Sequence, residues 1–154
     1  MTGIGEFDEA LLNAAREAMR NAYAPYSGFA VGAAVRLNDG TIITGANFEN
    51  ASLGLSLCAE TVALATANSA GRLRDIVAIA VVGEPIAGGA QEGGAVLTPC
   101  GRCRQILTEA AQLAGRDIPV YCADVSGERR ATYRVSQLLP HAFSAAAFAR
   151  GPNN

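Results

Sequence analysis

Three cysteines and a glutamate, in two short segments, limit most strongly what this chain can fold into. The first segment is Cys58-Ala59-Glu60 and the second is Pro99-Cys100-Gly101-Arg102-Cys103. Cys100 and Cys103 are three residues apart, so at a helix start both sulfur atoms can face one point, and Cys58 can approach it from a second helix. Three thiolates around a zinc ion leave the fourth tetrahedral position open for water, as in a catalytic zinc site.

A closed structural zinc site, or a redox site, is the alternative interpretation of these cysteines. A structural site needs a fourth ligand, and Cys122 and His141 are the remaining candidates of the usual type. Cys122 lies in a segment typical of a core strand, and His141 follows Pro140 at a turn. This interpretation also leaves Glu60 without a role.

The length and charge of the chain limit its function. A chain of 154 residues predicts one domain spanning residues 1–154. Half of the residues are hydrophobic and 17% are charged, which indicates that part of the surface is buried against other subunits. The formal net charge of -2 argues against a nucleic-acid partner and favours a small, weakly charged substrate.

No segment has the pattern of a membrane span or a secretion signal, so we expect no membrane partner. Residues 1–20 predict an amphipathic helix with early acidic residues, without the basic start and apolar middle of a signal peptide. Four cysteines in a chain of this size, two of them in Cys-x-x-Cys, favour a reduced metal site over disulfides. We therefore expect a cytoplasmic protein.

Apolar periodicity and turn residues divide the chain into helices and strands. The continuous apolar run at residues 76–82 is typical of a strand covered on both faces. Residues 85–94 contain four glycines and no periodicity, and they predict a loop. Both cysteine segments then lie at helix starts, where the partial positive charge of the helix stabilises thiolates. Helices are expected at residues 8–21, 57–69 and 101–114, a helical turn at 136–139, and strands at 29–37, 41–48, 76–82, 95–97 and 118–124.

Five segments, in this order, resemble one known family. They are residues 25–34, 47–52, 58–60, 99–105 and 138–143. Together they resemble the homotetrameric type of cytidine deaminase, a member of the cytidine/deoxycytidylate deaminase superfamily. The resemblance extends from about residue 26 to residue 143, and it is to the form of the family that has three cysteine ligands. The resemblance implies an α/β fold with three α/β/α layers, in which a mixed five-stranded sheet carries helices on both faces.

The resemblance also implies a role for each residue of the two cysteine segments. Cys58, Cys100 and Cys103 would bind one Zn²⁺ per chain. Glu60 would be the catalytic proton shuttle, which takes a proton from the activated water and passes it to the ring nitrogen and then to the leaving amine. The implied reaction is the hydrolytic deamination of cytidine and 2′-deoxycytidine in pyrimidine salvage.

Five further residues match substrate-binding positions of the family. Asn47 and Glu49 match the pair that hydrogen-bonds the ribose, and their spacing places them on one face of a strand. Phe29 matches the aromatic residue of the base pocket, and the backbone of Ala59 would bind the pyrimidine edge. Phe143 matches an aromatic residue that reaches a neighbouring subunit's site, which implies a homotetramer. The alternatives are strand-end polar groups for Asn47 and Glu49, a core residue for Phe29, and local packing of the C-terminal segment for Phe143.

Three features depart from the family pattern. Thr61 stands where many members have an arginine that donates to the ligand sulfurs and offsets their negative charge. Our hypothesis is that Arg104, directly after Cys103, offsets this charge instead. Leu53 stands where many members have a tyrosine at a subunit interface, and the loop at residues 85–94 is longer than usual.

An alternative group of substrates and an alternative class of deaminase compete with this prediction. Blasticidin S deaminase shares Pro-Cys-Gly-Arg-Cys-Arg-Gln and also lacks the arginine after Cys-Ala-Glu, so a cytosine nucleoside antibiotic or a modified cytidine is the alternative substrate. The segment Asn47-Phe48-Glu49-Asn50 favours ribose recognition. An RNA- or DNA-editing deaminase would need a basic strand-binding surface and usually a histidine as first ligand, and this sequence has neither.

Overall fold

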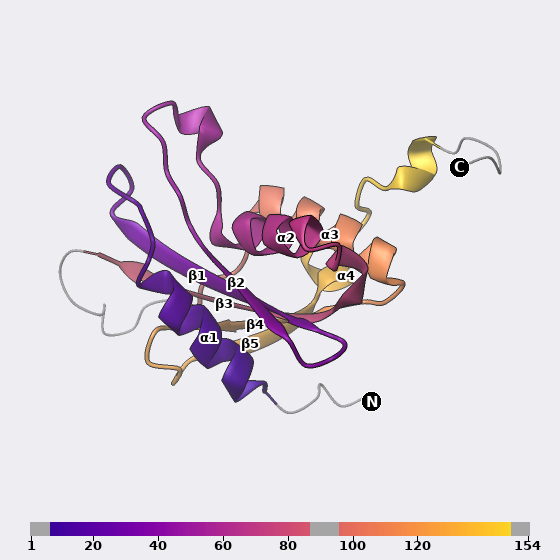
Figure 1. Cartoon of the computed structure of the whole chain (residues 1–154), viewed down its shortest axis with the longest axis horizontal. Coiled ribbons are helices and arrows are strands. Elements are labelled where there is room, and N and C mark those ends of the chain that lie inside the picture. The colour runs from indigo at the N-terminus through magenta and orange to yellow at the C-terminus, as the bar shows by residue number, and fades with distance from the viewer. Residues whose placement is uncertain (1–6, 87–95, 149–154) are drawn as a thin grey trace.

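Five strands form one mixed sheet at the centre of the molecule (Figure 1). The computed structural model describes residues 7–86 and 96–148. The strands are β1 Phe29–Leu37, β2 Ile42–Ala46, β3 Ile76–Pro85, β4 Pro119–Ala123 and β5 Arg130–Arg134. Their order across the sheet is β2-β1-β3-β4-β5. Only β3 and β4 pair in parallel, and the other three pairs are antiparallel.

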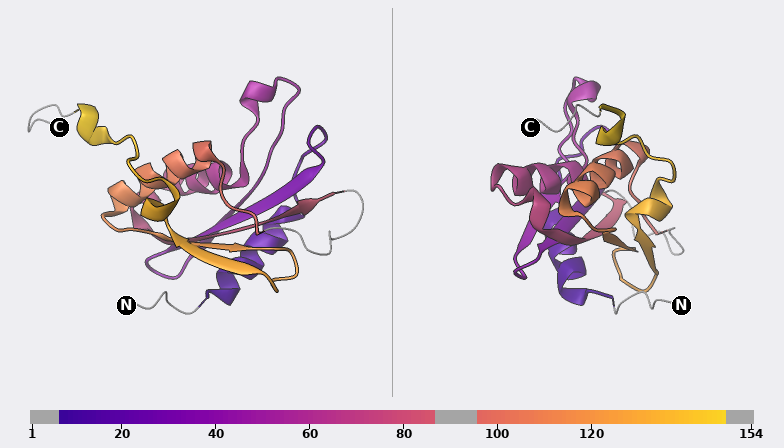
Figure 2. Two further views of the ribbon diagram at one scale, coloured as in Figure 1. Left: turned by 180° about the vertical axis from the view of Figure 1, so that it is seen from behind. Right: turned by 90° about the vertical axis from the view of Figure 1, so that its right-hand side faces the viewer.

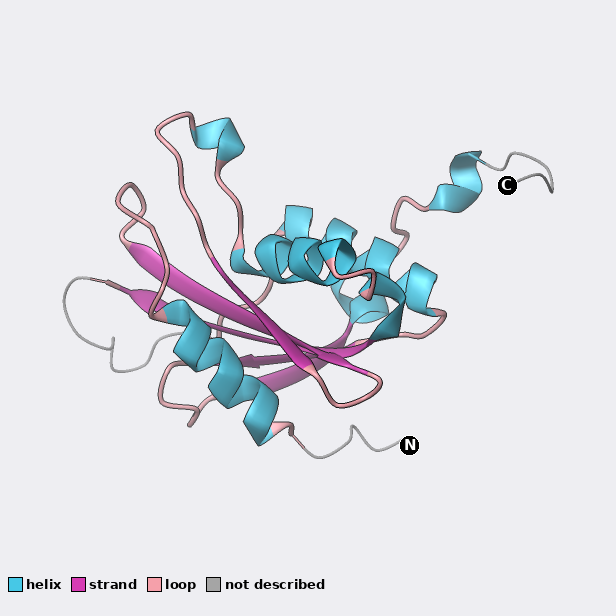
Figure 3. Ribbon diagram, viewed as in Figure 1, coloured by secondary structure: helices cyan, strands magenta, loops and turns pink. Residues whose placement is uncertain are grey.

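Helices cover both faces of the sheet, which confirms the predicted three-layer α/β/α fold (Figures 1 and 2). Helix α1, Glu9–Met19, packs on one face, while α2, Ala59–Ser69, and α3, Gly101–Ala114, lie on the other. The short α4, Val135–Leu138, contacts α3. Single 3-10 turns at Leu53–Leu55 and Leu73–Asp75 lie in connecting segments, and one at Ala145–Phe148 lies in the C-terminal segment (Figure 3). In residues 7–86 and 96–148, no helix is long and apolar enough to cross a membrane.

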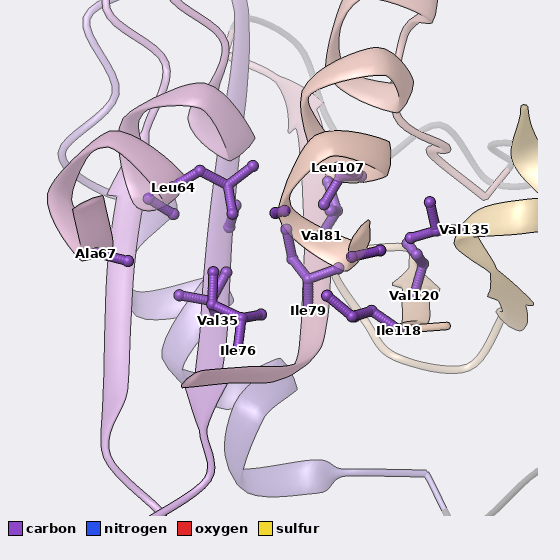
Figure 4. Close-up of a cluster of buried hydrophobic side chains, with 14 of the residues drawn as sticks. Val35, Leu64, Ala67, Ile76, Ile79, Val81, Leu107, Ile118, Val120 and Val135 are labelled. Atoms are coloured by element: carbon purple, nitrogen blue, oxygen red, sulfur yellow. The ribbon is translucent and has the colours of Figure 1, made fainter. Parts of the chain in front are cut away.

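The two faces of β3 explain its continuous apolar sequence. Ile79 and Val81 belong to the core between the sheet and the helices α2 and α3, whereas Ala80 and Val82 belong to the core under α1. Figure 4 shows the first core, where branched side chains of the sheet meet Leu107 of α3. Complete burial of each such side chain contributes about 1.5–3 kcal/mol, so this core holds both cysteine-bearing helices against the sheet.

Asp8 begins α1 and joins it to the sheet. Its Oδ1 accepts a hydrogen bond from the backbone N–H of Leu11 at 3.0 Å, as an N-cap does. Its two carboxylate oxygens also accept from the guanidinium of Arg36 in β1, at 2.6 and 2.8 Å. Helix α1 comes close to β1 because Gly32 has no side chain: a Cβ there would lie 2.0 Å from the carbonyl oxygen of Ala15.

One predicted strand is wrong, and the fifth strand lies elsewhere. Val96 and Leu97 form no strand, and residue 95 lies outside the described residues. Leu97 packs over the sheet at Gly83, which has no side chain. A Cβ at Gly83 would lie only 2.5 Å from the Cδ2 of Leu97. The fifth strand is β5, an edge strand with the sequence Arg-Ala-Thr-Tyr-Arg. Such a polar sequence has too little apolar alternation to predict a strand, and pairing with β4 forms it.

The other predicted elements occur with small changes at their ends. The helix predicted at residues 57–69 begins at Ala59, because Cys58 occupies the N-cap position. Helix α3 has the predicted limits. Strand β3 continues to Pro85, which was predicted to start the loop, and residues 87–94 of that loop lie outside the described residues.

Candidate active site

The N-termini of α2 and α3 bring the three cysteines together. Cys58 and Cys100 are the N-cap residues of the two helices, both with extended backbone, and Cys103 lies in the first turn of α3. All three Sγ atoms lie within 4.8 Å of one another, and those of Cys58 and Cys100 are 3.9 Å apart. Two sulfurs bound tetrahedrally to one zinc ion at about 2.3 Å are about 3.8 Å apart. The donor set therefore fits zinc.

This group of sulfur atoms leaves a coordination position for water. Among the described residues, neither Cys122 nor His141 belongs to the group. Cys122 is fully buried in the core around β4, as predicted. His141 lies in the segment after α4, with a left-handed backbone at φ 56°. The arrangement therefore matches a catalytic zinc site better than a closed structural one.

The thiols of Cys58 and Cys103 differ in how readily they ionise. A hydrogen bond from Cys103 lowers the pKa of the Cys58 thiol to about 6, and a bond from Cys100 and the charge of Arg102 act in the same direction against the effect of burial. The bond with Cys58 raises the pKa of Cys103, and burial adds to this rise. Cys58 therefore presents a thiolate to a metal ion more readily than Cys103 does.

Glu60 lies beside the sulfur atoms in a dry environment. It is the second residue of α2, and only 4% of its surface is exposed. Burial raises the pKa of its carboxyl, and the negative charge of Cys58 raises it further. A carboxyl with a raised pKa holds a proton more readily than an exposed carboxyl does, which suits a group that takes up and releases a proton. Its position and its pKa both suit proton transfer beside a metal ion.

A cavity of about 250 Å³ joins the sulfur atoms to the predicted substrate-binding residues. Cys58, Cys100 and Glu60 lie in its wall. Phe29, Asn47, Glu49 and Ala59 also line it, whereas Phe143 does not. Sequence reasoning missed the other lining residues, of which Thr98 could have been found from its place next to the Pro-Cys-x-x-Cys segment. These other lining residues are Ser27, Val31, Ser56, Leu57, Leu97 and Thr98.

A second cavity, of about 580 Å³, lies away from the cysteines between the C-terminal half of α3 and the segment around α4. Its wall includes Arg116, Asp117 and His141. Neither the three cysteines nor Glu60 lines this larger cavity, so we place the reaction in the smaller cavity.

Asn47 and Glu49 are held in place by the backbone around β1. The Oδ1 of Asn47 accepts from the N–H of Val31 at 2.9 Å, and its Nδ2 donates to the carbonyl of Phe29 at 2.8 Å. The Oε2 of Glu49 accepts from the N–H of Tyr26 at 2.9 Å. These bonds orient both side chains on one wall of the cavity before any ligand arrives.

Arg104 anchors the segment that leads into Cys100. Its Nε donates to the carbonyl of Pro99 at 2.8 Å, and its Nη1 donates to the carbonyl of Leu138 at 3.0 Å. Its Nη2 donates to the hydroxyl of Thr98 at 3.3 Å. Within the described residues, its hydrogen bonds therefore go to oxygen atoms and not to the ligand sulfurs, and its offsetting of the thiolate charge stays a prediction.

Phe143 lies on the C-terminal segment, which extends away from the sheet (Figure 1). Its side chain is 59% exposed and meets the ring of Phe148 edge to face, with the centroids 5.4 Å apart. The side chain of Gln105 donates to its backbone carbonyl at 2.9 Å. The ring is thus free to contact another molecule.

Two helix starts, one with Cys-x-Glu and one with Cys-x-x-Cys, meet over a mixed sheet to form a metal site beside a buried carboxyl. This combination defines the class of zinc-dependent deaminases. Within this class, the chain belongs to the cytidine and deoxycytidylate deaminase family, whose zinc-binding region matches residues 5–115.

Individual relatives agree with this assignment. The cytidine deaminase of Halalkalibacterium halodurans is 46% identical over 135 residues, which cover 88% of this chain and 92% of the relative. The crystal structure of cytidine deaminase from Burkholderia pseudomallei has a TM-score of 0.77 at 42% identity, covering 90% of this chain and 100% of that one. A blasticidin-S deaminase from Bacillus cereus is 33% identical over 81 residues, which cover 53% of this chain and 57% of the relative.

Proposed function

We propose that this protein catalyses the zinc-dependent hydrolytic deamination of cytidine and 2′-deoxycytidine. One observation carries the proposal: the sulfur group, the buried carboxyl of Glu60 and the oriented pair Asn47 and Glu49 meet at one cavity. Deamination of a cytosine ring needs an activated water and a proton carrier at the same ring edge. The relatives with the highest identities among those described above are cytidine deaminases.

In this reaction water adds to C4 of the cytosine ring, the bond from C4 to the exocyclic nitrogen breaks, and uridine and ammonia leave. Zinc, when held by Cys58, Cys100 and Cys103, supplies a Lewis acid that makes a water molecule more acidic. Glu60 accepts a proton from this water and delivers it to the ring nitrogen N3. It then takes the remaining proton from the new hydroxyl group at C4 and delivers it to the leaving amine as the carbonyl forms. Its burial keeps bulk water from competing for the proton.

Other residues of the cavity wall bind the rest of the nucleoside. We propose that the carboxylate of Glu49 accepts hydrogen bonds from the ribose hydroxyls and that the side-chain amide of Asn47 also hydrogen-bonds them, since both polar groups line the cavity. Phe29 packs on the base, and the backbone of Ala59 pairs with the pyrimidine edge next to Glu60. The bonds of Asn47 to Phe29 and Val31 link the ribose-binding residue to the base-binding strand.

The Glu60→Gln variant tests the assigned proton shuttle. Because glutamine cannot transfer the proton, turnover of cytidine should fall about 10²–10⁴-fold while one zinc per chain is retained. The exposed Glu109→Gln on α3 is the matched control and should keep full activity. A Glu60→Gln enzyme with normal turnover would contradict the assignment.

A substrate panel separates cytidine from the alternative substrates. Zinc-loaded protein is mixed with cytidine, 2′-deoxycytidine, modified cytidines and blasticidin S, and the ultraviolet absorbance change of deamination is followed. The blasticidin-S deaminase relative is less identical and matches a shorter part of the chain than the cytidine deaminases, so we expect cytidine and 2′-deoxycytidine to react fastest. No reaction with either nucleoside would overturn the proposal.

We further propose that the protein is a homotetramer whose sites are shared, with Phe143 reaching the cavity of a neighbouring subunit. Large apolar side chains on two segments that stand away from the sheet support this: Leu53, Leu55, Phe143 and Phe148 are each more than half exposed. Light scattering measures the assembly.

A mixing experiment tests the shared site directly. Phe143→Ala and Glu60→Gln chains, each of low activity alone, are unfolded together and refolded. Mixed assemblies contain sites with an intact Glu60 from one chain and an intact Phe143 from another, so activity should return. If mixing restores nothing although mixed assemblies form, Phe143 does not act across the interface.

We propose that the chain works as one domain, in the cytoplasm and in pyrimidine salvage. All five strands belong to one sheet, which supports the single domain. None of the four cysteines, all within the described residues, forms a disulfide, as expected in a reducing compartment. Growth of a strain that depends on cytidine as its source of uracil compounds measures the salvage role.

A further inference from the structure

Thr61 makes an unusual contact for a threonine in a helix. It lies in the first turn of α2, and its Oγ1 is 3.8 Å from the Sγ of Cys103 in α3. The hydroxyls of Thr66 and Thr108 instead donate to carbonyls four residues earlier in their own helices, both at 2.8 Å. For Thr61 that carbonyl belongs to Leu57, and it already accepts from the N–H of Phe48 at 2.9 Å. The hydroxyl of Thr61 therefore faces the sulfur.

Cys103 is the ligand that most needs a hydrogen bond from the protein. It is fully buried, whereas Cys58 is partly exposed and Cys100 is exposed. When zinc is bound, Cys103 is a thiolate and has no proton to donate, so the direction of the bond is settled: Thr61 donates and the sulfur accepts. A buried anion without a donor is costly, and water cannot supply one here.

The nearby arginines have other hydrogen-bond partners. The guanidinium of Arg104 donates to the oxygens of Pro99, Thr98 and Leu138, and Nη1 of Arg102 donates to the carbonyl of Ser56 at 3.3 Å. None of these four bonds reaches Cys103. Thr61 therefore differs from Arg102 and Arg104, because its side chain contacts a ligand sulfur.

We propose that Thr61 is a positioning residue that donates a hydrogen bond to the zinc-bound thiolate of Cys103, in place of the charged donor expected at this position. The inference rests on the proposed zinc-dependent function. The bond withdraws electron density from one of three thiolates, which leaves the metal a stronger Lewis acid for the water beside Glu60. The bond also ties the start of α2 to the first turn of α3.

Cobalt-substituted protein tests this bond without any substrate. The variants are Thr61→Val, which replaces the hydroxyl with a methyl group, Thr61→Ser, which keeps it, and Thr66→Val, which makes the same change about one and a half turns further along α2. Removing a donor raises the energy of the sulfur lone pairs, so the thiolate-to-cobalt absorption band should move to longer wavelength in Thr61→Val only. Zinc should also pass to a chelator about 10-fold faster from Thr61→Val.

Kinetics provide the second measurement. In Thr61→Val, kcat for cytidine should fall about 10-fold with KM unchanged, and Thr61→Ser should restore kcat. The proposal is overturned if the cobalt band of Thr61→Val coincides with that of the unaltered protein, or if Thr61→Ser behaves like Thr61→Val. If Thr61→Val binds no cobalt, normal spectra for Thr61→Ser and Thr66→Val support the hydroxyl's role. A shifted band together with an unaltered protein that deaminates nothing would contradict the proposed function but not the bond.

Discussion

The substitution Gly45→Ala tests whether close packing of α2 on the sheet sets the position of the active-site residues. Gly45 lies in β2 directly under α2. A Cβ at this position would stand 2.5 Å from both the carbonyl oxygen of Ala59 and the amide nitrogen of Ala63. Ordinary contacts of this kind are 3.4–4 Å. Both neighbours are backbone atoms, so no side-chain rotation can relieve the overlap, and the start of α2 must move by about 1 Å.

This displacement has two expected costs. Overpacking a core by one methyl group destabilises a protein by about 1–3 kcal/mol, and we expect about 3 kcal/mol here because the clash is with backbone. Ala59 lies between Cys58 and Glu60, so the shift also moves a zinc ligand and the proton shuttle. A misplacement of about 1 Å costs on the order of 10²-fold in turnover.

The assay combines thermal or urea unfolding with kcat and zinc content. Gly54→Ala is the control, because it adds the same methyl group where no atom lies within 4 Å. It should unfold and turn over like the unaltered protein. If Gly45→Ala has full activity and an unchanged free energy of unfolding, the close approach of α2 does not position the site and the reasoning fails.

Three further predictions concern single residues. Asp8→Ala should lower the free energy of unfolding by about 2 kcal/mol, because it removes both the N-cap and the ion pair with Arg36. The hydrogen bond with Arg36 lowers the pKa of Asp8, so its carboxylate stabilises the fold fully above the ordinary value of 3.8, and this contribution is lost as the pH falls through the lowered pKa. Urea unfolding should therefore show a smaller deficit of the variant at pH 3 than at pH 7. In metal-free protein, the rate at which iodoacetamide alkylates Cys58 should rise with pH and have its midpoint near pH 6, as mass spectrometry of the labelled protein can show. Zinc should block this alkylation. A midpoint near pH 9 would contradict the lowered pKa of Cys58. The Arg104→Ala variant should release zinc to a chelator about 10-fold faster, because it loses the hydrogen bond that holds the backbone before Cys100. Unchanged zinc release and turnover would show that Arg104 does not support the site.

Elements with a strong local signal were predictable, and those formed by long-range pairing were not. Helix α3 has the predicted limits, since Cys100 at its N-cap and Gly115 at its C-cap are both local features of the chain. Strand β3 was predictable because burial on both faces makes its whole sequence apolar. Strand β5 was missed because it is a polar edge strand that depends on β4. The segment at Val96 and Leu97 has strand-like residues but packs over the sheet, as Gly83 leaves room there.

The sequence by itself determined the donor set and its position at two helix starts, because the spacing of Cys58, Glu60, Cys100 and Cys103 acts within single helical turns. Only the tertiary structure decided how these groups are surrounded. Thr61 and Cys103 are 42 residues apart and meet only because α2 and α3 pack side by side on the sheet. The burial that raises the pKa of Glu60 likewise arises from packing between elements distant in the chain. Spacing fixes which atoms can converge, but hydrogen bonds and burial across elements depend on how those elements pack.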